Sequence, residues 1–262
     1  MRARTRSAAA AGAFYPADAG ELRRAVDGLL AAAPARAGAE AGAPAAVVAP
    51  HAGYVYSGAT AAAALALLPR RARVALLGPS HVVPLDGCAV SGADGWETPL
   101  GVVPVAPDLR DAAVAAGAVV DDRPHARDHA LEVELPFLQR VCVEGLEILP
   151  VAVGRSSAGE AAALVAALAD AATVVVSTDL SHYLDDASAR RVDRATAEAV
   201  LARDAGAIGL EDACGVFALR GLVEHARRAG WQARLLDLRT SADATGDGRS
   251  VVGYGAFAFA GA

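Results

Sequence analysis

Short runs of β-branched and other apolar residues alternate along the chain with longer stretches rich in Ala and Leu. The clearest runs are 46–49, 73–78, 146–151 and 173–177. Each has the length of a strand that is buried on both faces. Alternation of such strands with helical segments is typical of a parallel sheet covered by helices on both sides. The sequence therefore predicts one α/β domain over residues 1–262, with a mostly buried central sheet.

The other expected elements follow from the same periodicity. Helices are predicted over 18–30, 57–68, 108–116, 128–143, 157–170, 188–203 and 212–230, and further strands over 100–105, 232–238 and 250–259. Residues 31–44 are rich in Ala, Gly and Pro without any period, which predicts a low-complexity loop. Residues 1–10 are expected to be flexible.

Several classes of protein are excluded by composition. The longest apolar stretch, 59–68, is too short to cross a bilayer, so we expect no membrane association. The basic start is followed by a short Ala-rich run and then Phe14-Tyr15-Pro16, which does not fit a secretory signal. A net charge of −6 without an aromatic-basic patch argues against a nucleic-acid partner.

Cysteine usage points to a reducing compartment. The chain has three cysteines, an odd number, and they are widely spaced at Cys88, Cys142 and Cys214. This pattern does not fit a disulfide framework. We therefore expect a cytoplasmic protein.

Three of the six histidines lie just beyond the ends of three predicted strands. His51 follows the strand at 46–49, His81 follows the one at 73–78, and His182 follows the one at 173–177. In open α/β sheets, ligands bind outside the carboxyl ends of the strands. A single histidine in such a place is most often a surface or capping residue. Three at matching ends favour one shared pocket.

Clustered imidazoles serve metal binding or proton transfer, and a metal would need a further anionic ligand. Two residues can supply it. Asp179 precedes His182 by three residues, and Cys214 lies at the expected start of a helix, where the helix dipole favours a thiolate. The alternative for Cys214 is a small buried side chain.

A further polar group comes from the segment predicted as a helix over 128–143. His129 and Glu132 are three residues apart, so they would share a face of that helix. They can contribute to the pocket. With equal weight, they form the solvated first turn of an ordinary amphipathic helix, and Pro136 should kink that helix.

Eight motifs taken together resemble one protein family. They are AFYP at 13–16, APHAGYVYSG at 49–58, GPSH at 78–81, ETPLG at 97–101, HALEVELPFL at 129–138, STDLSHY at 177–183, DACG at 212–215 and VGYG at 252–255. In this order they resemble the Memo family, the protein B component of the AmmeMemoRadiSam system. The resemblance extends over nearly the whole chain.

The resemblance implies a fold similar to that of class III (LigB-type) extradiol dioxygenases. It implies a mononuclear metal site with His51, His81 and Cys214 as ligands. Asp179 and His182 match pocket residues beside the ion, and Phe14 and Tyr56 match aromatic residues that line it. The sequence departs from the family after Cys214, where Val216-Phe217-Ala218 replaces a basic residue followed by Pro-Ile.

Two imidazoles and one thiolate leave room for an exogenous group, as open catalytic metal sites require. We expect Fe(II), with Zn or Cu as alternatives. His182 is predicted to be the acid/base, oriented by Asp179. Ser80 is expected in the pocket, and Tyr54 and Tyr56 either hydrogen-bond a bound oxygen species or belong to the core.

Three functions remain open at this stage. The first is an iron-dependent oxidoreductase of the dioxygenase type with an unknown small substrate. The second is a zinc hydrolase, in which the metal activates water and His182 or Glu132 is the base. The third is a non-catalytic protein with a vestigial metal site, whose cleft binds a peptide or a radical-SAM partner from the same system.

Overall fold

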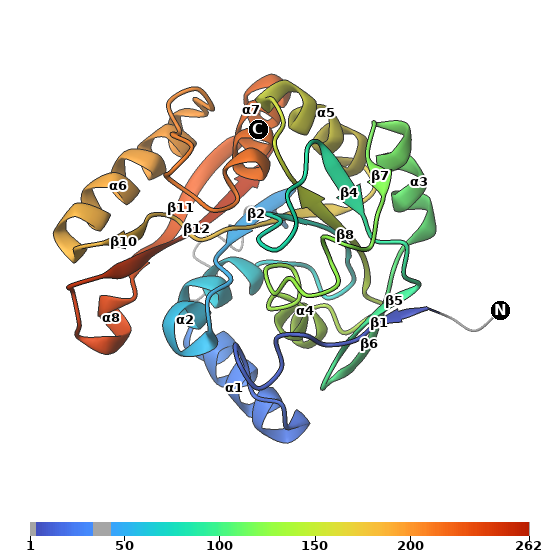
Figure 1. Ribbon diagram of the computed structural model, residues 1–262, viewed down its shortest axis with the longest axis horizontal. Coiled ribbons are helices and arrows are strands. Elements are labelled where there is room, and N and C mark those ends of the chain that lie inside the picture. Colours follow the sequence, from blue (N-terminus) through green and yellow to red (C-terminus); the bar gives the residue numbers. More distant parts are fainter. Residues whose placement is uncertain (1–3, 34–42, 262) are drawn as a thin grey trace.

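The computed structural model describes residues 4–33 and 43–261 and contains a nine-stranded mixed sheet (Figure 1). Its centre is parallel, in the order β2 (Ala46–Ala49), β9 (Thr173–Ser177), β3 (Arg73–Gly78) and β8 (Glu147–Val153). The strand residues are almost all fully buried, as expected for short apolar strands covered on both sides. The predicted α/β class is confirmed.

Antiparallel strands extend this parallel centre on both sides. Beyond β2 lies β12 (Val251–Ala260), which pairs with both β10 (His182–Leu184) and β11 (Gln232–Thr240). Beyond β8 lie β4 (Cys88–Val90) and β7 (Val119–Val120). A separate three-stranded sheet consists of β1 (Thr5–Arg6), β5 (Gly95–Thr98) and β6 (Gly101–Pro104).

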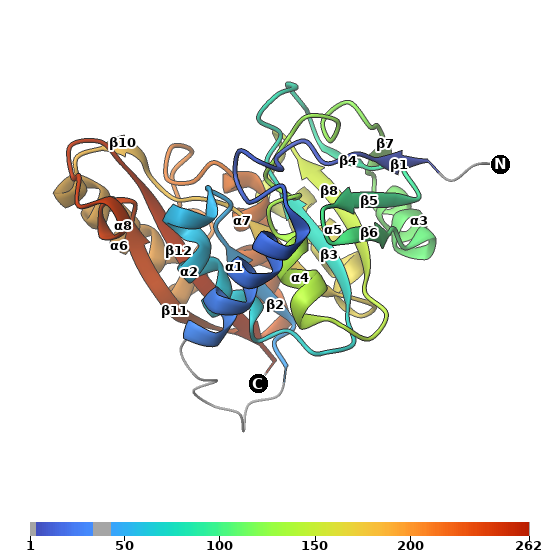
Figure 2. The ribbon, with the colours of Figure 1, turned by 90° about the horizontal axis from the view of Figure 1, so that it is seen from below.

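Helices cover both faces of the large sheet, as Figures 1 and 2 show together. On one side lie α1 (Ala19–Ala32), α2 (Tyr54–Leu65) and α4 (Leu135–Val141). On the other side α5 (Ala158–Ala169) packs closely against α7 (Val216–Ala229), with α3 (Pro107–Ala115) beside α5. The helix α6 (Asp186–Ala202) packs on β11 and β12, and α8 (Ala242–Thr245) is a single turn. Within the described ranges, no helix has both the length and the apolarity needed to cross a membrane.

The predicted helix over 128–143 is wrong in its first half. Residues 130–134 form turns, and the helix proper is α4, which begins at Leu135. Pro136 is the physical reason, because proline lacks an N–H and fits the first turn of a helix far better than its interior. His129 and Glu132 are therefore not on a shared helix face.

The start of the chain and the beginning of the expected loop over 31–44 also differ from expectation. Instead of a flexible segment over 1–10, Thr5–Arg6 forms β1 and pairs with β5, and Arg6 is buried. Residues 1–3 lie outside the described residues. Of the expected loop over 31–44, residues 31 and 32 belong to α1, and 34–42 again lie outside the described residues.

The contact between α5 and α7 depends on a glycine. A Cβ at Gly221 would lie 2.4 Å from the Cβ of Ala161. We expect Gly221→Ala to lower the free energy of unfolding by about 1–3 kcal/mol, because overpacking outweighs the gain in helix propensity. Urea denaturation measures this. Gly28→Ala in α1 is the control, since nothing lies within 4 Å and the same substitution should stabilise. Equal effects at both positions would contradict the packing argument.

Candidate metal centre

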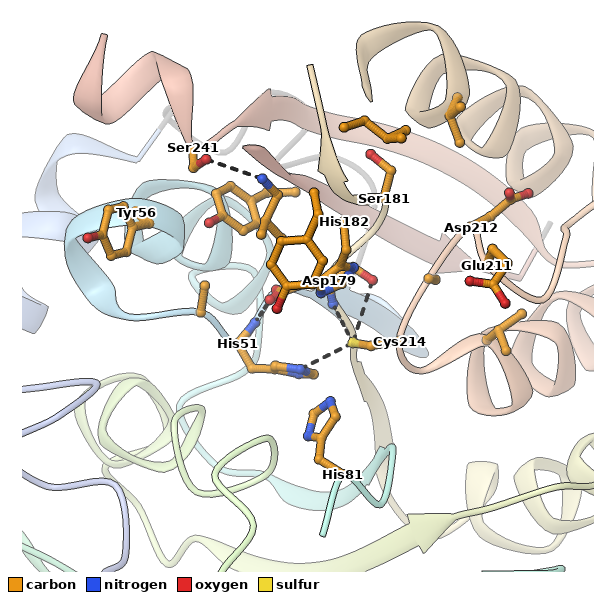
Figure 3. A pocket seen from close by; sticks show the side chains of 18 of the residues that line it. His51, Tyr56, His81, Asp179, Ser181, His182, Glu211, Asp212, Cys214 and Ser241 are labelled. Atoms are coloured by element: carbon orange, nitrogen blue, oxygen red, sulfur yellow. Dashed lines mark hydrogen bonds between the residues drawn. The ribbon is translucent and has the colours of Figure 1, made fainter. Parts of the chain in front are cut away.

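The site lies where three neighbouring parallel strands end. The chain leaves β2 at Ala49 and reaches His51, leaves β3 at Gly78 and reaches His81, and leaves β9 at Ser177 and reaches Asp179. Because β2, β9 and β3 are adjacent in the sheet, their carboxyl ends bring these residues together. Figure 3 shows His51, His81 and Cys214 directed toward one another.

Three imidazoles meet at this edge. Donor nitrogens of His51, His81 and His129 all lie within 4.8 Å of one another, so the group can hold a metal ion. Their ring centroids are 4.9 to 5.4 Å apart. Burial, together with the neighbouring imidazoles of His81 and His129, lowers the pKa of His51 well below its ordinary value. The ring is therefore neutral at physiological pH, which is the state that binds metals.

Cys214 lies beside His51 but does not belong to the group of three imidazoles. Its Sγ lies 3.3 Å from Nε2 of His51 and accepts a hydrogen bond of 3.3 Å from the backbone N–H of Asp179. Burial and the carboxyl group of Asp179 raise the pKa of this thiol to about 12. We expected the start of α7 to lower this pKa, but burial outweighs that effect. A metal ion would have to displace the thiol proton in order to bind here.

Asp128 holds the ring of His81, although no role was predicted for this residue. Its Oδ2 accepts a hydrogen bond of 2.6 Å from the backbone N–H of His81, and its Oδ1 lies 3.1 Å from Nδ1 of the same residue. Although burial opposes it, the hydrogen bond from His81 lowers the pKa of Asp128 to about 2. A carboxylate on one ring nitrogen is a common way of orienting a metal-binding histidine. The only signal in the sequence is its place directly before His129.

A large cleft opens over the cluster, with a volume of about 1150 Å³. Phe14 lines it and stacks on the ring of His129, with 4.1 Å between centroids. Tyr56 lines it as well, and it is 47% exposed. The far wall comes from the segment before α7, including Glu211 and Asp212 (Figure 3). The cleft exceeds the volume that a drug-sized ligand commonly occupies.

Three residues predicted for the pocket do not line this cleft, namely Tyr54, for which a core position was the alternative, Ser80 and Glu132. Tyr54 is buried, and its hydroxyl donates to the backbone carbonyl of Val133. Ser80 donates to the carbonyl of Val83 and lines a smaller neighbouring pocket. Glu132 is fully buried and paired with Arg6, so its carboxylate is not available as a catalytic base.

Asp179 and His182 both line the cleft, but the predicted link between them differs. The carboxyl group of Asp179 accepts hydrogen bonds from the backbone N–H groups of His51 and Ala52, and burial raises its pKa to about 7. Burial lowers the pKa of His182. Asp179 therefore holds the loop that carries His51 rather than the imidazole of His182.

The residues that depart from the family pattern fall on the wall of the cleft. Val216 and Phe217 line it, and Ala218 is buried behind them. Phe217 also lines the smaller pocket next to Cys214. The departure therefore changes the shape of the wall and leaves the cysteine in place.

Comparison with known proteins identifies the relatives of this chain. The family model described as Memo-like protein matches residues 6–258. A MEMO1 family protein of Methanopyrus kandleri is 36% identical and covers 97% of this chain and 98% of its own length. A second, from Aquifex aeolicus, is 34% identical and covers 96% and 97%. A third, from Nitrosopumilus maritimus, is 36% identical over 81% of this chain and 83% of its own length. The chain belongs to the Memo family.

Proposed function

We propose that this protein is a metal-dependent oxidoreductase of the dioxygenase type that acts on a small organic substrate in the cleft. The observation that supports it most is the meeting of three imidazoles and a thiol at the floor of that cleft. The donor atoms lie close together without an ion, and all four residues line the cleft in which a substrate would lie. Glu132, one of two candidate bases for a zinc hydrolase, is unavailable because it is paired with Arg6.

His51 and His81 would hold the ion, with Cys214 as the anionic ligand after loss of its proton. His129 lies close enough to replace or supplement that sulfur. Ferrous iron is the ion we propose, with zinc and copper as alternatives. A ferrous ion held by these residues would supply the redox chemistry that couples O₂ to an organic substrate.

His182 is proposed as the group that moves protons in the cleft. It lines the cleft but does not belong to the imidazole group that can hold a metal. Its lowered pKa keeps the ring neutral at pH 7, so that one ring nitrogen can accept a proton. Phe14 and Tyr56 would form the walls against which the substrate lies.

The setting of this activity is proposed on chemical grounds. All three cysteines are free thiols, which supports the reducing cytoplasm expected from their number. Neither a nucleic acid nor a membrane is an expected partner. A radical-SAM protein of the same system stays a prediction from the family resemblance.

Metal analysis after purification without oxygen tests the proposal. We expect about one iron per chain in the wild type and little iron in Cys214→Ala, because the variant lacks the anionic ligand. In the cobalt-substituted protein, a thiolate-to-cobalt charge-transfer band should be present in the wild type and absent from the variant. His182→Ala is the matched control and should keep both the iron and the band.

Other results of these measurements would favour a different ligand or a different function. Full iron content in Cys214→Ala, without a thiolate band in the wild type, would make His129 the third ligand. Zinc in place of iron, with turnover that survives anaerobic conditions, would favour a hydrolase. A folded wild-type protein that binds neither metal would contradict the enzyme proposal and favour a peptide-binding or partner-binding protein.

A further inference from the structure

A buried carboxyl group lies behind His51, on the side away from the cleft. Glu134 and Ser177 are both 0% exposed, and His51 is 1% exposed. The Oγ of Ser177 lies 2.8 Å from Nδ1 of His51 and also 2.8 Å from Oε1 of Glu134. The other carboxyl oxygen of Glu134, Oε2, is buried without a hydrogen-bond partner. Neither residue has a part in the function proposed above.

The serine has a third polar neighbour, and this neighbour decides where the protons are. Its Oγ lies 2.8 Å from the backbone carbonyl oxygen of Ala130, which can only accept. A hydroxyl donates one hydrogen bond and accepts two. If Ser177 donates to Ala130, its contacts with His51 and Glu134 must be made by donors on those two residues. Nδ1 of His51 then carries a hydrogen, and so does the carboxyl group of Glu134.

The other arrangements leave buried groups unpaired. If Ser177 donates to an ionised Glu134, the carbonyl of Ala130 faces an oxygen without a proton between them. The charged carboxylate would also keep one oxygen, Oε2, without a partner. A buried charge that lacks a partner costs far more free energy than a neutral acid in the same place.

We infer that Glu134 is a neutral carboxylic acid that donates its proton to Ser177, and that this pair fixes the tautomer of His51 with the Nε2 lone pair facing the cleft. Glu134 and Ser177 are thus positioning residues. The inference rests on the proposed metal function, since the exposed lone pair is the one that a metal ion would use. Hydrogen bonds of this kind on the far ring nitrogen orient metal-binding histidines in many proteins.

Two further observations agree with this assignment. Burial, and the carboxyl group of Asp179 nearby, raise the pKa of Glu134 to about 8 despite the contact with Ser177. The other titratable groups that face it are Tyr54, whose hydroxyl is occupied by Val133, and His51 beyond the serine. On the opposite side of the ring, the neutral thiol of Cys214 lies 3.3 Å from Nε2, where it can donate to the same lone pair.

The metal-free wild-type protein gives the first test. Long-range ¹H–¹⁵N spectra of protein labelled at histidine report which ring nitrogen carries the hydrogen. We expect the Nδ1–H tautomer for His51 at pH 7, and the Nε2–H tautomer would overturn the inference. An infrared difference spectrum of the wild type against Glu134→Gln should contain the C=O band of a protonated carboxylic acid. Carboxylate bands in its place would overturn it equally.

Cobalt affinity gives the second test. We expect Ser177→Ala to bind Co²⁺ about 10-fold to 100-fold more weakly, because the ring of His51 loses its acceptor. Glu134→Gln should keep most of the affinity, since its amide N–H can replace the acid proton, whereas Glu134→Ala should not. Ser91→Ala is the control, because Ser91 is equally buried outside the cleft.

The outcomes separate this inference from the proposed function. Wild-type affinity in Ser177→Ala would overturn the positioning role. An equal loss in Glu134→Gln and Glu134→Ala would overturn the neutral acid. If the wild type itself bound no metal, the proposed function would fail, while the tautomer and the infrared band would still confirm or refute the proton positions.

Discussion

Replacing His51 with alanine is expected to abolish metal binding. Its imidazole lies near the rings of both His81 and His129, and its Nε2 lies 3.3 Å from the sulfur of Cys214. The variant therefore loses the one residue that contacts all the other donors of the proposed site. We expect Co²⁺ affinity to fall by more than about 100-fold, the upper end of what the loss of a supporting hydrogen bond causes. Dialysis and metal analysis should give a nearly metal-free protein.

A distant histidine controls for general effects of losing an imidazole. His225 in α7 packs against Trp231, with 4.6 Å between ring centroids, and does not line the cleft. His225→Ala should bind one ion per chain with the affinity of the wild type. Stoichiometric, tightly bound metal in His51→Ala would show that the ion lies outside the histidine cluster.

The largest expected effect on stability comes from Glu132→Ala. The carboxylate of Glu132 is fully buried and accepts hydrogen bonds from the guanidinium of Arg6, the hydroxyl of Tyr15 and the backbone N–H groups of Ala9 and Ala10. Alanine would leave the buried charge of Arg6 without its partner. Breaking a buried ion pair on one side costs about 3–5 kcal/mol. Urea denaturation followed by circular dichroism measures the loss.

An exposed ion pair provides the comparison. Arg70 and Glu144 form a bridge of 3.1 Å, with side chains 71% and 58% exposed. Glu144→Ala should change the free energy of unfolding by no more than about 1 kcal/mol. A loss of similar size in the two variants would contradict the argument that burial makes the Arg6–Glu132 pair costly to break.

The positions of His51 and His81 could be predicted because strand ends converge in a parallel sheet. Short apolar runs followed by Gly, Pro or His are visible in the sequence. Because β2, β9 and β3 are neighbours in the sheet, the residues that follow these runs come together. Cys214 was predicted near them, and its Sγ lies against His51. Phe14 and Tyr56, which came from the family resemblance, line the same cleft.

Other parts of the site could not be read from the sequence because they depend on contacts between distant segments. Tyr54 and Tyr56 are two residues apart on α2, so they point to different sides of the helix, and only packing decides which one meets the cleft. Glu132 and Glu134 look alike in sequence, yet Glu132 is paired with Arg6 and Glu134 contacts Ser177. The ordered start of the chain depends on that same pairing with Arg6.

The order of strands has a consequence for how the protein reaches its native state. The last strand of the described residues in chain order, β12, pairs directly with β2, more than two hundred positions earlier in the chain. Such remote pairing gives the fold a high contact order, which slows folding because long loops must close first. During translation this edge of β2 stays unpaired until β12 has left the ribosome. The chain is therefore most exposed to aggregation at that stage.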